Sequence, residues 1–246
     1  MSGLIGGILR DKLAGRYNLR ALNRSEVAGV DCHQADIVDF EAIQPAFEGI
    51  DVVVHLAAFA KLDEDFEKNL QTNIIGTYNV FESARRAGVR RIVFASSGAV
   101  VTGWESTPPY DAVTSGRYED VPDNWQPVTH ESAPRPVAIY GCSKLWGEAL
   151  ARHYSDAHGM SMCCLRIGRV NPENRPLEPR HWSVWCSHRD VAQIIEKCIS
   201  APPSLKYDLF YAVSNNKWSY RDIDHAREIL GYTPEDSADD FEMKRS

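Results

Sequence analysis

Three apolar runs separated by helical patterns constrain the fold of this chain more than any other feature. The runs cover residues 51–57, 91–96 and 160–167. Asp51-Val-Val-Val-His-Leu-Ala57 has the nearly continuous apolar composition of a strand that is buried on both faces of a parallel sheet. The segments between the runs carry apolar residues at helical spacing, and Gly88 ends one of these helices. Strands that alternate with helices in this way predict an α/β fold with a parallel sheet.

Length, charge and composition argue against several classes of protein. The chain has 246 residues, of which 43% are hydrophobic and 25% charged, and this suits one large globular domain. Its net charge of -7 argues against a nucleic-acid partner. No apolar run is long enough to span a membrane and the N-terminus lacks a signal-peptide pattern, so we expect a cytoplasmic protein without a membrane partner. The six cysteines show no paired spacing of metal ligands, so no metal site is expected.

The first residues contain part of a phosphate-binding turn. Gly3-Leu4-Ile5-Gly6 leads into a short amphipathic helix, and its glycines have the spacing of the last two in a Gly-x-x-Gly-x-x-Gly turn. The strand and the first glycine of such a turn are missing, so we expect a sheet that lacks its first strand and leaves two neighbouring strands unpaired. Met1 is then expected to be an internal start, a misplaced gene boundary or the start of a truncated form. The alternative is a flexible glycine-rich start without function.

The strand expected at residues 18–23 bears on the choice of cofactor. In dinucleotide-binding folds an acidic residue at the end of this strand selects NAD, and a nearby Arg accommodates the extra phosphate of NADP. This chain has Asn23 followed by Arg24, which favours NADP over NAD. The alternative interpretation of Arg24 is a surface arginine in a turn.

Tyr140 and Lys144 form the candidate catalytic pair. Residues four apart share one face of a helix, here the one expected over residues 139–158. A lysine ammonium beside a phenol lowers the pKa of the tyrosine, which makes it a general acid and base near neutral pH. Ser97 lies at the carboxyl end of the apolar run at residues 91–96, where open parallel sheets bind ligands. Tyr-x-x-x-Lys alone is also an ordinary helix-surface spacing.

The order of these motifs resembles that of the extended short-chain dehydrogenase/reductase superfamily, also called the NAD-dependent epimerase/dehydratase family. The ordered set includes His55-Leu-Ala-Ala58, Asn73 and Leu165-Arg-Ile-Gly168, and it covers essentially the whole chain. Within this superfamily the chain is most similar to uronate dehydrogenases. The motifs that carry this closer similarity are Tyr140-Gly-Cys-Ser-Lys144, Arg166-Ile-Gly168 and Trp185-Cys-Ser-His188-Arg-Asp190.

The resemblance implies a Rossmann-like fold, with a doubly wound parallel sheet and one NAD(P)-binding domain over residues 1–246. Residues 166–190 and 205–246 would form a small substrate-side part. The resemblance also implies a sugar-type substrate and a homodimer formed through the helices near residues 66–87 and 139–158.

Roles for individual residues follow from the same resemblance. Tyr140 would be the general base, and Lys144 would lower its pKa and hold the nicotinamide ribose. Ser97 would hydrogen-bond the reacting oxygen, with Ser96 as a less favoured candidate, and Asn73 would support a proton relay. The cofactor site would be lined by Gly3, Leu4, Ile5, Gly6, Asn23, Arg24, Asp36, Ile37, Leu56, Ala57, Ala58, Lys144 and Ile167. The substrate would be contacted by Ser97, Gly98 and Arg180, of which Arg180 matches the position that holds a sugar carboxylate.

The chain differs from uronate dehydrogenases at the substrate side. Gly98-Ala99 stands where those enzymes have Asn-His in contact with the sugar. The segment between Ser97 and Tyr140 is longer than usual, and its proline-rich part at residues 102–136 is expected to be a surface loop.

We therefore expect an NAD(P)-dependent oxidoreductase that transfers hydride between a nicotinamide cofactor and a sugar or sugar-acid hydroxyl. One alternative is a sugar epimerase or dehydratase that uses the cofactor transiently. Another is a non-catalytic dinucleotide-binding protein, which the incomplete phosphate turn favours.

Overall fold

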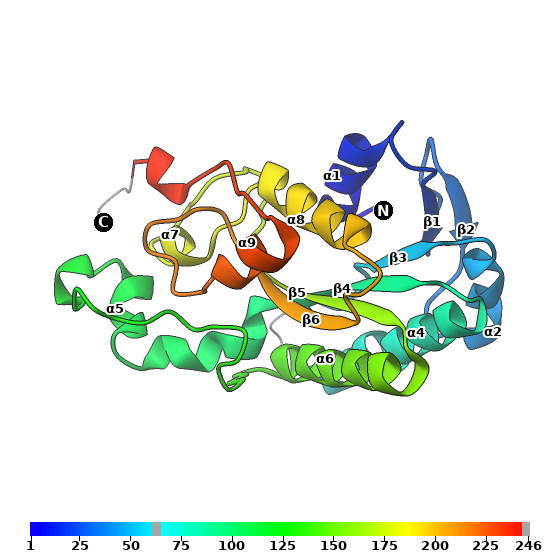
Figure 1. Cartoon of the computed structure of the whole chain (residues 1–246), viewed down its shortest axis with the longest axis horizontal. Helices are drawn as coiled ribbons and strands as arrows, with labels where there is room; N and C mark the ends of the chain where they lie inside the picture. The colour runs from blue at the N-terminus through cyan, green and yellow to red at the C-terminus, as the bar shows by residue number, and fades with distance from the viewer. Residues whose placement is uncertain (61–64, 243–246) are drawn as a thin grey trace.

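The computed structural model describes residues 1–60 and 65–242, and it has the predicted α/β architecture. Parallel strands form a layer that is covered by helices on both faces (Figure 1). The strands are β1 (Arg20–Asn23), β2 (Asp31–Gln34), β3 (Val52–His55), β4 (Arg91–Ser97), β5 (Ser161–Ile167) and β6 (Tyr207–Ala212). Within these ranges, no helix is long and apolar enough to cross a membrane.

The strands are divided between two sheets. One has the order β1-β2 and the other has the order β3-β4-β5-β6, and all pairs are parallel. In the described part of the chain β1 is not paired with β3, and the β1-β2 pair stands beside the larger sheet (Figure 1). This division agrees with the expectation of a sheet that lacks a strand between two neighbours.

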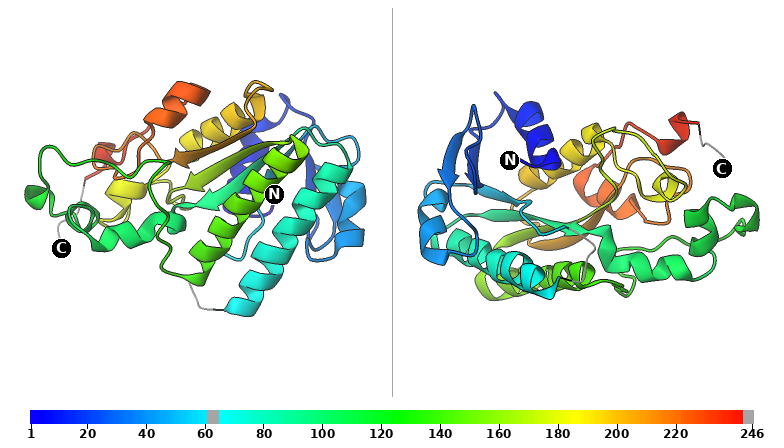
Figure 2. Two further views of the ribbon diagram at one scale, coloured as in Figure 1. Left: turned by 60° about the horizontal axis from the view of Figure 1, so that its bottom comes forward. Right: turned by 180° about the vertical axis from the view of Figure 1, so that it is seen from behind.

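The helices that cover the larger sheet have the predicted positions. On one face, α1 (Leu4–Leu13) packs against α8 (His188–Ser200). On the other face, α4 (Gly76–Arg86) and α6 (Ile139–His158) lie side by side (Figure 2). The shorter helices are α2 (Phe40–Ile43), α3 (Phe66–Lys68), α5 (Tyr110–Ser115), α7 (His181–Val184) and α9 (Asp224–Leu230). Tight 3-10 segments lie at Gln44–Phe47, Gly98–Ser106, Tyr118–Asp120 and Ala238–Asp240, and a π-helical segment at Asn69–Ile75 precedes α4.

Strand β4 separates two hydrophobic cores. Its Val93 and Ala95 belong to the core beneath α1 and α8, whereas Ile92 and Phe94 belong to the core beneath α4 and α6. This alternation follows from the period of two along a strand, and it buries both faces of β4. The central strand is thereby fixed in position, together with the serine at its end.

The segment expected to be a surface loop is folded only in part. Residues 98–106 form 3-10 turns and α5 follows, whereas residues 121–136 contain no helix or strand, so the expectation of a surface loop over residues 102–136 is wrong for its first half only. Val100, Val101 and Val113 are fully buried in a third core, where they pack with Tyr211 and Tyr220. The prolines obscured this apolar pattern in the sequence, because they suggested loop throughout.

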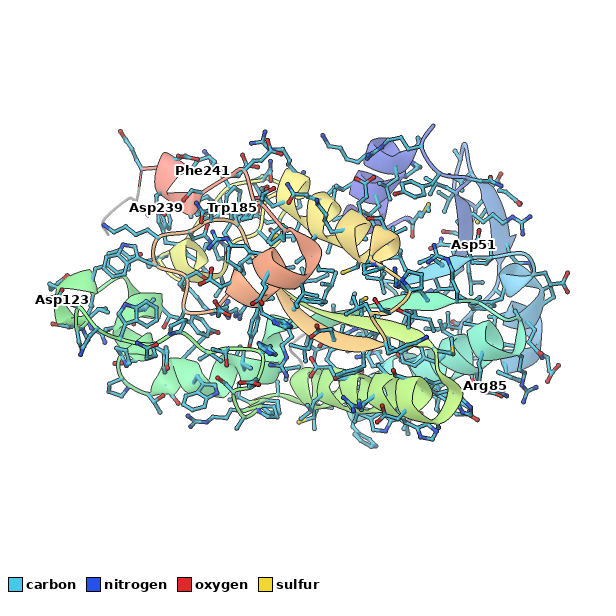
Figure 3. All side chains as sticks on the ribbon, viewed as in Figure 1. Asp51, Arg85, Asp123, Trp185, Asp239 and Phe241 are labelled. Carbon is cyan, nitrogen blue, oxygen red and sulfur yellow. The ribbon has the colours of Figure 1, made fainter. Side chains whose placement is uncertain are left out.

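The end of the described chain packs against α7 and the residue that follows it. Trp185 contacts Phe241 edge to face with ring centroids 5.5 Å apart (Figure 3), and Ala238 is fully buried beside Trp185 and Trp182. Aromatic contacts of this kind add to the stabilisation from area burial.

Candidate active site

The structure brings Ser97, Tyr140 and Lys144 together at the carboxyl end of the larger sheet. Ser97 ends β4, and Tyr140 is the second residue of α6. The Ser97 hydroxyl lies beside the phenol of Tyr140 and favours its phenolate form. The Lys144 ammonium lies 5.9 Å from the centre of the Tyr140 ring and donates a 2.7 Å hydrogen bond to the carbonyl oxygen of Ala95. A hydroxyl, a phenol and an ammonium thus meet where parallel sheets bind their ligands.

Burial dominates the electrostatics of this pair. It lowers the pKa of Lys144 to about 7, although the negative charge of Glu148 raises it. Burial also raises the pKa of Tyr140, and the Ser97 hydroxyl only partly opposes this. This direction is opposite to the expectation that Lys144 lowers the pKa of Tyr140 below its ordinary value. The physical reason is that the desolvation penalty of a buried phenolate is larger than the stabilisation that the neighbouring groups give it.

Ser96 and Ser97 point to different partners. The Ser96 hydroxyl donates a 2.5 Å hydrogen bond to Glu148, and this carboxylate is also paired with Arg166 through two 2.9 Å hydrogen bonds. The Glu148 and Arg166 side chains are each only 4% exposed. Ser96 is thus committed to a buried ion pair, and Ser97 is the serine that faces Tyr140.

Asn73 lies in the π-helical segment and is almost completely buried. Its amide both accepts a hydrogen bond from the Phe59 backbone nitrogen and donates one to the Phe59 carbonyl oxygen. It also donates a 2.9 Å hydrogen bond to Ser143, which in turn donates to the carbonyl oxygen of Tyr140. Asn73 therefore ties the segment after β3 to the first turn of α6. Single turns of π-helix of this kind are frequent at functional sites.

The residues expected to bind the cofactor lie at the start of α1 and after strands β1, β2 and β3. Gly3 is the N-cap of α1, no side chain caps this helix, and its first turn contains no acidic residue. A helix start without a side-chain cap suits an anion such as a pyrophosphate. Leu4, Ile5 and Gly6 belong to this turn, where the Met1 backbone packs against Gly6. Asn23 at the end of β1 accepts a 3.1 Å hydrogen bond from the Ser2 hydroxyl, which brings the two elements together. Arg24 is exposed.

The other expected cofactor residues differ in their surroundings. Ile167 pairs with Ser97 across β4 and β5, and Leu56, Ala57 and Ala58 follow β3 on the same edge. The Asp36 carboxylate accepts a hydrogen bond from the backbone nitrogen of Val38. The side chain of Ile37, however, is buried in the core against Gly76, and its carbonyl oxygen accepts a 2.9 Å hydrogen bond from Asn79.

Arg180 does not present an open fork to a substrate. Its Nε and Nη2 atoms donate hydrogen bonds of 2.6 and 2.7 Å to the two carboxylate oxygens of Glu105, 75 residues away. Burial would raise the pKa of Glu105, but Arg180 and Arg221 hold it below its ordinary value. Tyr220 donates a further 2.6 Å hydrogen bond to the same carboxylate. Glu105, Tyr220 and Arg221 had no place in the site expected from the sequence.

Comparison with known proteins decides the family. The family model described as "NAD dependent epimerase/dehydratase family" matches residues 1–183. The chain belongs to this family. It is 35% identical to uronate dehydrogenase of Agrobacterium fabrum, over 98% of this chain and 84% of that protein. It is 32% identical to NAD-dependent glucose-6-phosphate dehydrogenase of Haloferax volcanii, over 97% of this chain and 92% of that protein.

A solved structure of this family has the same fold. It is the crystal structure of a mutant uronate dehydrogenase from Agrobacterium tumefaciens complexed with NAD. The TM-score is 0.80 at 32% sequence identity, and the match covers 98% of this chain and 84% of that chain. The resemblance drawn from the sequence motifs and the predicted Rossmann-like fold are thus confirmed.

A buried histidine beside the site predicts how stability depends on pH. His55 ends β3, stacks on Phe94 and contacts Thr77 through Nε2 at 3.1 Å. Burial, with a smaller effect of the Lys144 charge, lowers the pKa of His55 from 6.5 to about 3. The unfolded chain therefore binds more protons below pH 6.5, and stability is lost as the pH falls from about 6.5 towards 3.

We expect His55→Gln to remove this acid sensitivity. The free energy of unfolding, measured with urea at about pH 7 and about pH 4.5, should fall by roughly 2–3 kcal/mol more in the wild type than in the variant. Replacement of the exposed His153 by Gln should retain the wild-type difference. An equal loss of stability in the wild type and His55→Gln would contradict the assignment.

Proposed function

We propose that this chain is an NAD(P)-dependent dehydrogenase that oxidises a hydroxyl of a sugar or sugar acid. The observation that carries the proposal is the placement of Ser97, Tyr140 and the buried Lys144 together at the carboxyl edge of the sheet. The names of the related proteins, which act on uronates and on a sugar phosphate, support a sugar-type substrate.

The start of α1 and the ends of β1 and β3 would hold a nicotinamide cofactor, which would supply the acceptor for the substrate hydride. Ser97 holds the reacting oxygen, and Tyr140 accepts the hydroxyl proton at its phenol oxygen. Because burial raises the pKa of Tyr140, the transfer depends on positive charge and hydrogen bonds that stabilise the phenolate. Lys144 supplies such a charge when protonated. Asn73 supports these groups by holding Ser143 and the backbone at Phe59.

Turnover with a panel of sugars tests the proposal. The chain should produce reduced cofactor from at least one uronate or aldose, in equal amounts with an oxidised sugar. An epimerase or dehydratase, the alternative within the family, would convert sugar without accumulating reduced cofactor. Cofactor binding without conversion of any sugar would instead support a non-catalytic dinucleotide-binding protein.

The choice between NAD and NADP is a separate part of the proposal. The related structure that was solved with NAD supports NAD as the cofactor. Asn23 and the exposed Arg24 favour NADP, which remains our prediction. Arg24→Ala should raise the KM for NADP by about tenfold or more, because a charged hydrogen bond to the additional phosphate is lost. The KM for NAD should change little. Arg20→Ala, which removes an exposed arginine of β1, the strand that Arg24 directly follows, is the control. Equal effects on both cofactors would contradict the NADP preference.

We also propose a homodimer formed by the helices near residues 66–87 and 139–158. Two large hydrophobic side chains on the first of these are exposed, Phe66 by 60% and Tyr78 by 47%. The two helices lie side by side on one face of the molecule (Figure 2). Sedimentation analysis of the wild type and Tyr78→Glu is the test, since a charge at the interface should shift a dimer to monomer.

A further inference from the structure

A cavity of about 440 Å³ lies at the opposite end of the larger sheet from Ser97, where α4 and α6 end and β4 and β5 begin. Strand β4 starts beside this cavity with Arg91 and ends with Ser97, so roughly 20 Å separates the cavity from the candidate active site. Arg85, near the end of α4, marks this end of the molecule in Figure 3. We call the space the basic cavity, because its charged lining residues are Arg85, Arg90, Arg91 and Lys206.

The basic cavity collects positive charge in a chain that is acidic as a whole. The chain has a net charge of -7, yet none of the described residues that line the cavity is aspartate or glutamate. The lining also includes His158, the last residue of α6. A concave site with charge of one sign attracts ligands of the opposite sign.

Two of the arginines have partners within the fold. Arg91 is only 1% exposed, and its guanidinium donates to the Ser161 hydroxyl and to four backbone carbonyl oxygens at and just beyond the end of α8. Its charge thereby offsets the negative end of the α8 dipole. Arg85 donates two 2.8 Å hydrogen bonds to Glu82, but this carboxylate is shared with Arg86. One carboxylate thus serves two arginines, which leaves an excess of positive charge.

Arg90 and Lys206 have no counter-charge among the described residues. Both are exposed. Within the described part of the chain, the Arg90 side chain makes no hydrogen bond, ion pair or ring contact. The Lys206 ammonium donates a 3.3 Å hydrogen bond to the carbonyl oxygen of Gly159. A guanidinium fork matches two oxygens of a phosphate group, and an ammonium adds a compact point charge.

The space beside these side chains is open. Gly88 follows α4, Gly159 caps α6, and both line the cavity. A Cβ atom added at either glycine would have no neighbour within 4 Å. The volume of the cavity lies within the range of sites that hold small molecules. An anion can therefore reach Arg90 and Lys206 without displacing another side chain at these glycines.

We propose that the basic cavity binds a phosphate group, either as inorganic phosphate or as the phosphate of a small ester, through the Arg90 fork and the Lys206 ammonium. The site is separate from the start of α1, where the pyrophosphate of a cofactor is expected. It also goes beyond the proposed function, because no step of the dehydrogenase reaction uses this end of the sheet.

Calorimetric titration of the full chain with inorganic phosphate and with glycerol 2-phosphate tests the site. The wild type should bind at least one of these probes, and the probe with the lower Kd identifies the source of the phosphate group. Arg90→Gln and Lys206→Gln should each raise this Kd by about tenfold or more, because each removes a charged partner of the phosphate. Arg90→Lys keeps the charge but loses the fork, so its Kd should lie between those of the wild type and Arg90→Gln.

Arg152→Gln and Lys12→Gln are the matched controls, because each removes an exposed positive charge outside the cavity. Both should keep the wild-type Kd. Arg90 and Lys206 lie outside the helices proposed to form the dimer, so their replacement should not change the oligomeric state. If the wild type binds neither probe, the site is overturned. An unchanged Kd in both cavity variants would also overturn it, since phosphate would then bind elsewhere. The titration uses neither cofactor nor sugar, so its result does not depend on the proposed dehydrogenase.

Discussion

Replacement of Tyr140 by Phe is expected to lower kcat by roughly two to four orders of magnitude, the range typical for removal of a general acid-base group. The variant retains the ring that packs beside Lys144 and loses only the phenol oxygen that lies beside Ser97. Cofactor binding and the thermal midpoint should therefore change little. Initial rates of cofactor reduction measure kcat, and a fluorescence titration measures cofactor binding.

Tyr17→Phe is the matched control for this experiment. The Tyr17 hydroxyl also has a polar partner, since it donates a 3.3 Å hydrogen bond to Glu196, but it lies on the opposite face of the sheet from α6. Its removal should leave kcat within about twofold of the wild type, as expected for a group outside the site. Full turnover by Tyr140→Phe would show that another group moves the proton.

Replacement of Glu148 by Gln is expected to produce the largest loss of stability. It leaves the Arg166 charge buried without a counter-charge, and the loss of one partner from a buried ion pair costs about 3–5 kcal/mol. Ser96 would lose its charged acceptor at the same time. The free energy of unfolding by urea measures the effect. Since the charge of Glu148 raises the pKa of Lys144, the variant should also lower that pKa further.

Two further variants test whether breaking the Glu148–Arg166 ion pair causes this loss of stability. The double variant Glu148→Leu with Arg166→Met removes both charges and should recover more than half of the lost stability. Asp156→Asn breaks the exposed Arg152–Asp156 pair on the same helix and should cost at most about 1 kcal/mol. A loss in Glu148→Gln no greater than that in Asp156→Asn would contradict a stabilising role for the buried pair.

The fold was predictable because local patterns determine it. The apolar run at residues 51–57 and the helical spacing that follows it identify β3 and α4 without knowledge of their neighbours. The folded segment after Ser97 was not predictable, because the burial of Val100 and Val113 depends on Tyr220, which lies far along the chain.

The candidate site was predictable only in part, for the same reason. The spacing of Tyr140 and Lys144 is local, and the position of Ser97 follows from a strand end. The pairing of Arg180 with Glu105 joins residues 75 apart, and no local signal indicates it. The pKa of Tyr140 depends on burial, which spacing alone does not give. One signal for Arg221, whose guanidinium occupies the space beside Gly98, does exist in the sequence: a glycine directly after the serine leaves space that another side chain can fill.

The most direct test of the central claim follows the hydride itself. A uronate or aldose that the protein converts is labelled with deuterium on the carbon that bears the reacting hydroxyl, and the cofactor is analysed by mass spectrometry. We predict that deuterium accumulates in the released, reduced nicotinamide in equal amounts with the oxidised sugar, and that Tyr140→Phe slows this transfer. Deuterium that remains on, or returns to, the sugar while no reduced cofactor accumulates would contradict a dehydrogenase.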